Sequence, residues 1–261
     1  MAAEAALAAS NRNVALAGAM LVASVGFAAT DPARAQSFDA GAEAASNEVR
    51  AGISWSGGKA SASADARVDL GIADVSLRMA ALRGAVRHGG ADVVADIALG
   101  RDWSLGAVTL RTEAIGHVFG GAAQGRNEGM DYGELALGAR YGIGPLRLSA
   151  TVWYAPSQST IGGDNLHLRA AADAGLPGLP ITLLASAGYT TGSGNAPRAA
   201  RLRPDGDYVD WKLGAEYSRY PLTFGLDYTG TDIAADRATI SPFADPAGGA
   251  DRIVARVRFS F

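Results

Sequence analysis

The end of the chain alternates regularly between apolar and polar side chains. One set of alternate positions holds Ile253, Ala255, Val257, Phe259 and Phe261, and the other holds Val254, Arg256, Arg258 and Ser260. Side chains of an extended strand point to opposite faces in turn, so this segment would have one apolar and one largely cationic face. An apolar strand that ends on an aromatic residue is typical of the closing strand of a bacterial outer-membrane barrel. We therefore expect barrel-assembly machinery to recognise the last strand through Phe261.

The same period-two alternation recurs along the chain from Asn47 onward. It marks about twelve segments, at residues 49–55, 60–70, 75–79, 93–99, 108–113, 134–141, 146–154, 166–173, 181–190, 209–217, 222–229 and 252–261. An amphipathic helix would instead repeat its apolar residues every three or four positions. The Gly, Thr and Tyr content of these segments also suits strands and turns better than helices. The pattern predicts an all-β chain folded as a transmembrane, antiparallel, up-and-down barrel of about 12 strands.

The connections between these segments alternate in length. Short ones lie at 71–74, 101–104, 142–145, 175–180 and 218–221, and longer ones at 117–130, 155–164, 191–206 and 233–250. Outer-membrane barrels have short periplasmic turns and longer outer loops. With both termini of the chain periplasmic, all these short turns would lie on the periplasmic side. The first two outer connections, near 56–59 and 87–91, are short and follow the rule less well.

The N-terminal region has the features of a secretory signal peptide. An apolar run at residues 14–29 follows Arg12, and the small residues Ala33 and Ala35 precede Gln36 with the spacing of a cleavage site. The run of about 16 residues is shorter than the roughly 20 that a spanning helix needs. We predict a signal peptide at 1–35 and a barrel at 36–261, exported through the inner membrane to the outer membrane of a Gram-negative cell.

The charged side chains are expected to line the barrel lumen. Hydrocarbon offers no water to solvate polar groups, so the lipid face must be apolar while the lumen can be polar. The predicted lumen-lining residues are Arg50, Asp65, Arg67, Asp69, Arg111, Glu134, Arg140, Arg147, Arg169, Asp210, Lys212, Glu216, Asp227, Arg256 and Arg258. Residues 65, 67 and 69 form either a substrate path or a salt-bridged wall. Tyr141, Tyr154, Tyr189, Tyr217 and Tyr228 lie near strand ends, where interfacial aromatic girdles occur.

A soluble β-sandwich or a periplasmic lipocalin-like barrel is the competing architecture. In such a fold the apolar set would form the core and the charged set would face water. The strand period is the same in both cases. The terminal aromatic residue, the alternating connection lengths and the number of strands favour the membrane barrel.

Catalytic and cofactor chemistry have little support in the sequence. The chain has no Cys, which excludes disulfides and thiolate metal sites, and its net charge of −3 argues against a nucleic-acid partner. The three histidines, His88, His117 and His167, lack metal-ligand spacing. His167 with Asp173 and Ser186 would make a triad, but a lumenal hydrogen-bond network is the simpler interpretation. We expect no enzyme activity and no cofactor.

Two C-terminal motifs resemble a known family. Residues 207–215 (DYVDWKLGA) and 220–232 (YPLTFGLDYTGTD), followed by the terminal strand, are similar to the end of the TorF-type porins. These proteins are also catalogued as Gcw_chp, a proteobacterial family of unknown function. The similarity is clear from about Ala136 onward, whereas the aromatic first strand of the family is reduced here to residues 49–54. The resemblance implies an outer-membrane barrel with at most pore activity, and it supplies no catalytic residues.

Two functions remain open from these observations. About twelve strands would enclose a lumen between the filled eight-stranded case and the open porins of sixteen or more strands. The first hypothesis is a porin, embedded in outer-membrane lipid, that lets ions and small solutes diffuse passively with weak ion selectivity. The alternative is a closed structural or adhesive barrel, whose opposite charges pair across the lumen and block it.

Overall fold

The computed structural model describes residues 37–121, 129–194, 197–234, 241–243 and 245–261. The predicted signal peptide at 1–35 lies outside the described residues. No helix within the described ranges is both long enough and apolar enough to cross a membrane.

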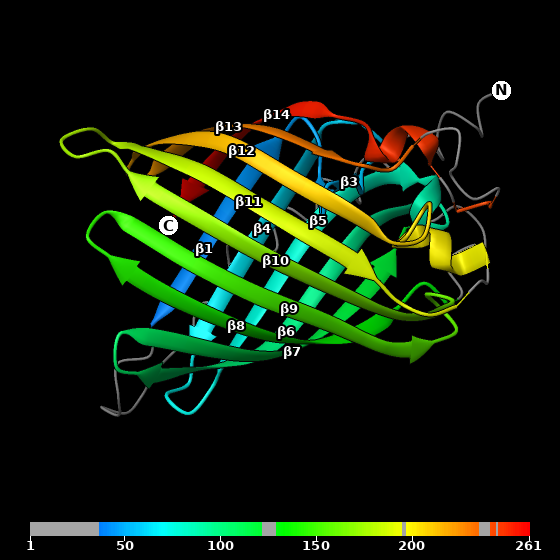
Figure 1. The fold of residues 1–261 in the computed structure, drawn as a ribbon, viewed down its shortest axis with the longest axis horizontal. Coiled ribbons are helices and arrows are strands. Elements are labelled where there is room, and N and C mark those ends of the chain that lie inside the picture. Colours follow the sequence, from blue (N-terminus) through cyan, green and yellow to red (C-terminus); the bar gives the residue numbers. More distant parts are fainter. Residues whose placement is uncertain (1–36, 122–128, 195–196, 235–240, 244) are drawn as a thin grey trace, which may run out of the picture. The chain divides into compact units, whose positions relative to one another are not determined.

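Twelve strands between Phe38 and Ser260 form a closed antiparallel barrel (Figure 1). Its strands are β1 (Phe38–Ala45), β4 (Ser61–Asp69), β5 (Asp74–Ala85), β6 (Ala91–Leu105), β7 (Val108–Gly120), β8 (Tyr132–Ile143), β9 (Leu146–Gln158), β10 (Gly163–Gly175), β11 (Ile181–Thr191), β12 (Tyr208–Arg219), β13 (Leu222–Thr231) and β14 (Arg252–Ser260). Neighbouring wall strands pair in chain order, and β1 pairs with β14 to close the ring. The prediction of an antiparallel up-and-down barrel with about 12 strands is confirmed.

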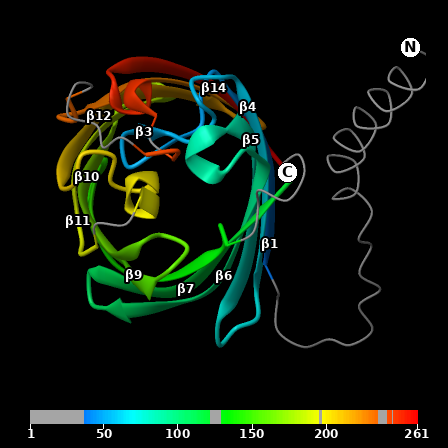
Figure 2. The same cartoon turned by 90° about the vertical axis from the view of Figure 1, so that its right-hand side faces the viewer.

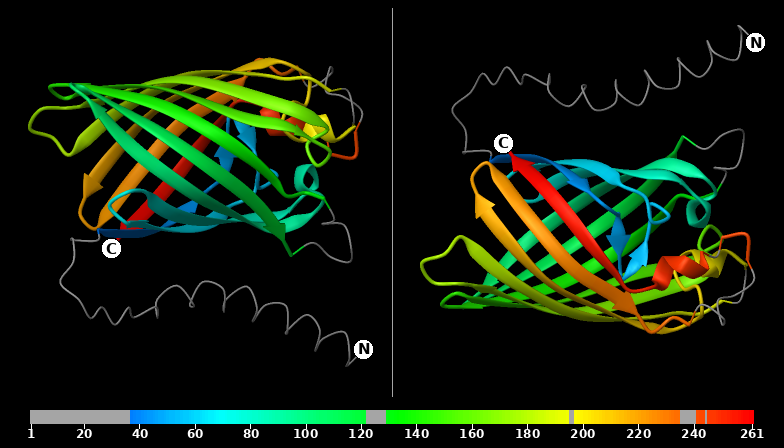
Figure 3. Two further views of the ribbon diagram at one scale, coloured as in Figure 1. Left: turned by 90° about the horizontal axis from the view of Figure 1, so that it is seen from below. Right: turned by 90° about the horizontal axis from the view of Figure 1, so that it is seen from above.

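The connections differ at the two ends of the barrel (Figure 3). The turn end holds the short connections β4–β5, β6–β7, β8–β9, β10–β11 and β12–β13, together with the start of β1 and the end of β14. The loop end holds the longer connections and the 3-10 helices η2 (Val86–His88), η3 (Pro197–Arg201) and η4 (Pro246–Gly249). One predicted turn was misplaced: β6 continues through 101–104 to Leu105, because Trp103 and Leu105 extend its outward apolar set.

The first predicted strand, at 49–55, is wrong. The first wall strand is β1, and residues 49–54 form a small inward hairpin of β2 (Val49–Arg50) and β3 (Ile53–Ser54). Ala51 and Gly52 have φ values of +47° and +71°, which reverse the chain where the alternation suggested a continuous strand. Ile53 and Trp55 are buried within the protein instead of facing outward. We call residues 46–59 the lumen hairpin.

The wall strands present their apolar residues outward and their polar residues inward. On β13, Leu226 is 56% exposed, whereas its neighbour Asp227 is 6% exposed. The five tyrosines predicted to form an aromatic girdle are all exposed on the outer surface of the barrel, at 40–43%. This arrangement is the reverse of a soluble barrel, whose apolar side chains would fill the interior.

The sequence predicts a polar lumen, but part of the barrel interior is apolar. Near the loop end, the lumen hairpin packs on inward residues of β5 to β9. The resulting buried cluster contains Trp55, Leu82, Val94, Phe119, Met130, Tyr132 and Ile161. An apolar core therefore fills part of the lumen at that end and gives the hairpin a fixed seat.

Candidate functional site

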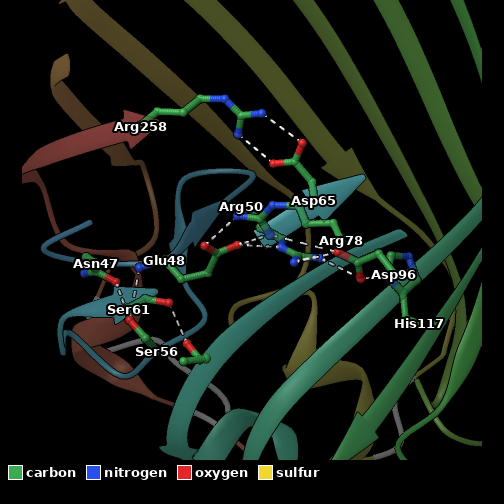
Figure 4. A network of polar contacts seen from close by, with 11 residues as sticks. Asn47, Glu48, Arg50, Ser56, Ser61, Asp65, Arg78, Asp96, His117 and Arg258 are labelled. Atoms are coloured by element: carbon green, nitrogen blue, oxygen red, sulfur yellow. Dashed lines mark hydrogen bonds and ion pairs between the residues drawn. The ribbon is translucent and has the colours of Figure 1, made fainter. Parts of the chain in front are cut away.

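The lumen hairpin is attached by ion pairs to the wall formed by β5 and β6 (Figure 4). The Arg78 guanidinium donates to both carboxylate oxygens of Glu48, at 2.8 and 2.9 Å. Arg50 reaches Asp96 with Nη2 2.8 Å from Oδ2, and its Nε donates to Glu48 at 3.0 Å. Two-point contacts between guanidinium and carboxylate fix orientation as well as distance. The base of the hairpin is therefore held in one position.

The tip of the same hairpin contacts the opposite wall. The Tyr208 hydroxyl on β12 donates to the Ala51 carbonyl at 3.1 Å. A Cβ added to Gly52 would lie 2.7 Å from Asp210 Cβ and 2.9 Å from the Gly230 carbonyl oxygen. Figure 2 shows β3 within the ring of barrel strands. The hairpin thus crosses the interior from β5–β6 to β12–β13.

Two cavities lie beside the hairpin. The smaller one, of about 210 Å³, is lined mainly by residues of β10 to β14 and β1, and these include Asp210, Lys212 and Asp227. The larger one, of about 580 Å³, is lined by residues from β4 to β12. Val49 and Ala51 of the hairpin line both cavities. The hairpin therefore lies next to both cavities, together with Arg78 and Arg169 of the wall, which also line both.

Near the turn end, predicted lumen residues gather around two carboxylates that sequence reasoning missed. Asp74 accepts from Arg67 at 2.9 Å and from Arg111 at 2.8 Å. Asp102 lies 3.2 Å from Arg111 and 3.3 Å from Arg140. Both carboxylates had been assigned to turns, although each continues the inward set of its strand.

Two further arginines pair along the closing strand β14. Arg258 makes a two-point contact with Asp65 at 2.6 and 2.8 Å. Arg256 Nη2 donates to Glu216 at 2.6 Å, and its Nε donates to Asp227 at 3.0 Å. Arg256–Asp227 joins neighbouring strands, whereas Arg256–Glu216 and Arg258–Asp65 each reach across one intervening strand of the inner wall.

The β10–β12 wall carries a less paired group. Arg169 donates to the Ser186 hydroxyl at 3.0 Å, while Lys212 lies directly across from Ser186. His167 Nδ1 lies 2.9 Å from the Thr190 hydroxyl and 3.8 Å from Asp210 Oδ2. Ser186 thus contacts Arg169 and not His167, so these residues do not form a triad. Within the described ranges, no cluster of His, Asp and Glu is suited to hold a metal.

The remaining predicted residues fall at three places. Arg50 lies in the lumen but on the hairpin, not on a wall strand. Glu134 on β8 lies 3.2 Å from His117, whose other ring nitrogen is 2.7 Å from Asp96. Asp69 and Arg147 lie exposed at the turn end, where Asp69 accepts from the Gly71 amide at 2.7 Å.

Three buried arginines hold the connections at the loop end together, and we call them the arginine cap. Arg87 donates to the carbonyls of residues 200 and 201 at 3.0 and 2.7 Å. Arg201 donates to those of residues 130 and 160 at 3.0 and 2.6 Å. Arg203 donates to those of residues 192 and 193, both at 2.6 Å. Burial lowers the pKa of Arg87 and of Arg201 to about 10, so both stay cationic at neutral pH.

Comparison with known proteins gives a family and a fold. The profile of a family described as "Bacterial protein of unknown function (Gcw_chp)" matches residues 91–261. No curated protein matches the chain. The solved NanC porin superposes with a TM-score of 0.53 at 9% identity, covering 86% of this chain and 99% of the porin. This similarity shows a shared barrel fold.

Two other solved barrels superpose more loosely. A loop-deletion mutant of OmpT, an outer-membrane protein of Vibrio cholerae, gives a TM-score of 0.43 at 11% identity, covering 87% of this chain and 99% of its own. LpxR from Salmonella typhimurium gives 0.41 at 11% identity, covering 85% and 99%.

Proposed function

The chain belongs to the Gcw_chp family of bacterial proteins of unknown function, and we propose that it is an outer-membrane channel for passive diffusion of ions and small solutes. The observation that carries this proposal is the contrast between the two faces of the wall. An outer face of apolar and aromatic side chains is stable in lipid, while an inner face of ion pairs beside cavities requires water. The sequence resemblance to TorF-type porins and the fold shared with the NanC porin support the same assignment.

The proposed orientation follows from the two ends of the barrel. Short turns and the first and last strand ends would face the periplasm, and the longer connections with the arginine cap would face outside. Assembly would proceed through the C-terminal strand that ends in Phe261, whose side chain is exposed while its amide donates to the Ala40 carbonyl of β1.

The charge distribution bears on what would pass. Each lumenal arginine in the ion pairs above has a carboxylate within 4 Å, so the fields of the two charges largely cancel at the path. A path lined by charges of one sign concentrates the opposite ion, whereas a balanced lining does not. We expect weak ion selectivity and small solutes, because the hairpin leaves separate cavities rather than one wide bore.

The lumen hairpin and the apolar cluster also favour a second candidate, a closed structural barrel. The lumen hairpin crosses the interior and is held at its base and at its tip, so any conducting path is limited to the space beside the hairpin. The two candidates differ in one measurable property, namely ion flux through a membrane that contains the protein.

The test is single-channel recording of the purified mature protein in a planar lipid bilayer. We expect small, reproducible conductance steps and a reversal potential close to zero in a KCl gradient. A variant in which a short glycine-serine link replaces residues 49–54 should give larger steps, because it lacks the hairpin that crosses the lumen. Absence of steps in the wild-type protein, with the barrel correctly folded by circular dichroism, would support the closed barrel instead.

A further inference from the structure

One arrangement recurs three times on the inner wall: an arginine reaches a carboxylate two strands away across an inward-facing glycine. The first case is a row formed by Arg256 on β14, Gly225 on β13 and Glu216 on β12, which are paired in register. The Arg256 side chain passes over Gly225, and its Nη2 donates to Glu216 at 2.6 Å. A Cβ added to Gly225 would lie 2.8 Å from the guanidinium carbon of Arg256.

The second case lies where β1 and β14 pair to close the barrel. Arg258 on β14 reaches Asp65 on β4 across Gly41 of β1, with contacts of 2.6 and 2.8 Å. Gly41 is paired in register with Asp65 on one side and Ser260 on the other. A Cβ at Gly41 would lie 2.6 Å from the Arg258 guanidinium carbon.

The third case lies near the turn end. Arg111 on β7 reaches Asp74 on β5 across Gly100 of β6, at 2.8 Å. Gly100 is paired in register with Asp74 and with Glu113, and Arg111 also lies 2.8 Å from the Glu113 carboxylate. A Cβ at Gly100 would lie 2.9 Å from the Arg111 guanidinium carbon.

Any side chain at these glycines would lift the guanidinium away from the wall. Atoms cannot approach a Cβ to within 3.0 Å without displacement, and the glycines lie on extended backbone between paired strands, where the wall cannot yield easily. The group that moves is therefore the long arginine side chain, and the free direction is into the lumen. An arginine moved in this way would both narrow the path and place an unpaired cation in it.

We propose that Gly41, Gly100 and Gly225 are positioning residues that keep these arginines flat against the wall, and so set the width and charge selectivity of the channel. The effect on conduction rests on the proposed function, whereas the seating of each arginine does not.

Gly138 on β8 provides a matched control. It faces inward like the other three, but a Cβ there would meet Thr151 Oγ1 at 3.4 Å, which is an ordinary contact. In planar bilayers we expect Gly225→Ala and Gly41→Ala to lose conductance and to shift the reversal potential toward that of the anion. Gly138→Ala should match the wild type. If Gly225→Ala and Gly41→Ala also match the wild type, the proposed role in selectivity is overturned.

A second measurement tests whether each glycine holds its arginine against the wall, and it does not require the protein to conduct ions. Gly225→Ala should lower the urea midpoint of unfolding in lipid when Arg256 is present, and should not lower it in the Arg256→Ala background, where alanine only reduces the entropic cost of glycine in a strand. Gly41→Ala with Arg258→Ala repeats the comparison, in case one pair fails to assemble. Equal shifts with and without the arginine would overturn the positioning role of the glycine. An arginine-dependent shift in a protein that conducts no ions would support the positioning role and contradict only the proposed channel function.

Discussion

Glu48 and Arg78 form a two-point ion pair, with both donor–acceptor distances below 3 Å, that joins the lumen hairpin to β5. The Glu48 side chain is only 7% exposed, so its charge depends on this partner and on Arg50. Removing one member of such a buried pair leaves an uncompensated charge and is strongly destabilising. The hairpin is therefore a fixed part of the lumen, and its tip is the better place to alter the path.

Gly52→Ala should move the tip away from β12 and β13. The new methyl group would lie 2.5 Å from Thr231 Cγ2 and 2.7 Å from Asp210 Cβ, so the tip must withdraw from the wall. We expect larger and noisier single-channel steps. Gly57→Ala is the control, because Gly57 has a similar φ of +62° but its Cβ would meet no described atom within 4 Å. Equal recordings from the two variants would contradict a constriction at the tip.

Replacement of both Arg256 and Arg258 by Glu should make the channel prefer cations. Each new carboxylate would join acidic neighbours that have lost their partner, namely Glu216 and Asp227 beside position 256 and Asp65 beside position 258. Reversal potentials in KCl gradients report the change, which should shrink in about 1 M salt, where the screening length falls to about 3 Å. Unchanged potentials in a folded double variant would place both residues outside the conducting path.

A cation on the outer face should harm the barrel far more than one on the inner face. Leu226 is 56% exposed on the outer surface, and Leu226→Arg should cost about 2–4 kcal/mol of unfolding free energy near the bilayer midplane. The inward control is Thr182→Arg, because Thr182 lies directly across from Glu216. Asp227 suits this purpose less well, since it is paired with Arg256. Equal urea midpoints for Leu226→Arg and Thr182→Arg in lipid would contradict the assignment of the outer and inner faces.

His88 should make the loop end sensitive to acid. Burial, with the charges of Arg201 and Arg87 nearby, holds the pKa of His88 well below its usual value. An unfolded histidine takes a proton below about pH 6.5 that folded His88 does not bind, so stability falls as pH falls.

His88→Phe keeps a ring beside Trp55 and Phe119, whose centroids lie 4.3 and 4.9 Å from the His88 ring. The variant should lose less stability on acidification, by up to about 1.4 kcal/mol for each pH unit below about 6.5. Unfolding in urea between about pH 8 and about pH 5 measures the difference. Parallel pH curves for the two proteins would show that His88 does not titrate on unfolding.

The wall strands could be predicted from the sequence because each side chain of such a strand has only two possible surroundings, outside the barrel or inside it. Leu226 and Asp227 must face different solvents, so adjacent residues reveal the strand and its two faces. The ends of β14, β13 and β12 followed from this rule. The first strand was missed because β1 has mostly alanines on its outer face and only two charged residues, Asp39 and Glu43. The difference in hydrophobicity between its two faces is therefore small.

The lumen hairpin could not be predicted by the same rule. Residues 49–55 alternate as a wall strand would, but Ala51 and Gly52 reverse the chain, and Ile53 finds its apolar surroundings inside the barrel. Apolar alternation reports that one face is hidden from water and does not say whether lipid or protein hides it. Glu48 and Asp74 were missed as partners of the lumenal arginines for a related reason, since ion pairs between strands depend on the register and not on spacing in the chain.

The arginine cap bears on how the exterior of this protein can change over generations. Arg87, Arg201 and Arg203 donate to main-chain carbonyls, which every amino acid carries. A substitution at an exposed accepting position such as Ser193 would change the surface of the loop end without removing an acceptor. The sequence constraint of the cap therefore falls mainly on three guanidinium groups that are themselves buried.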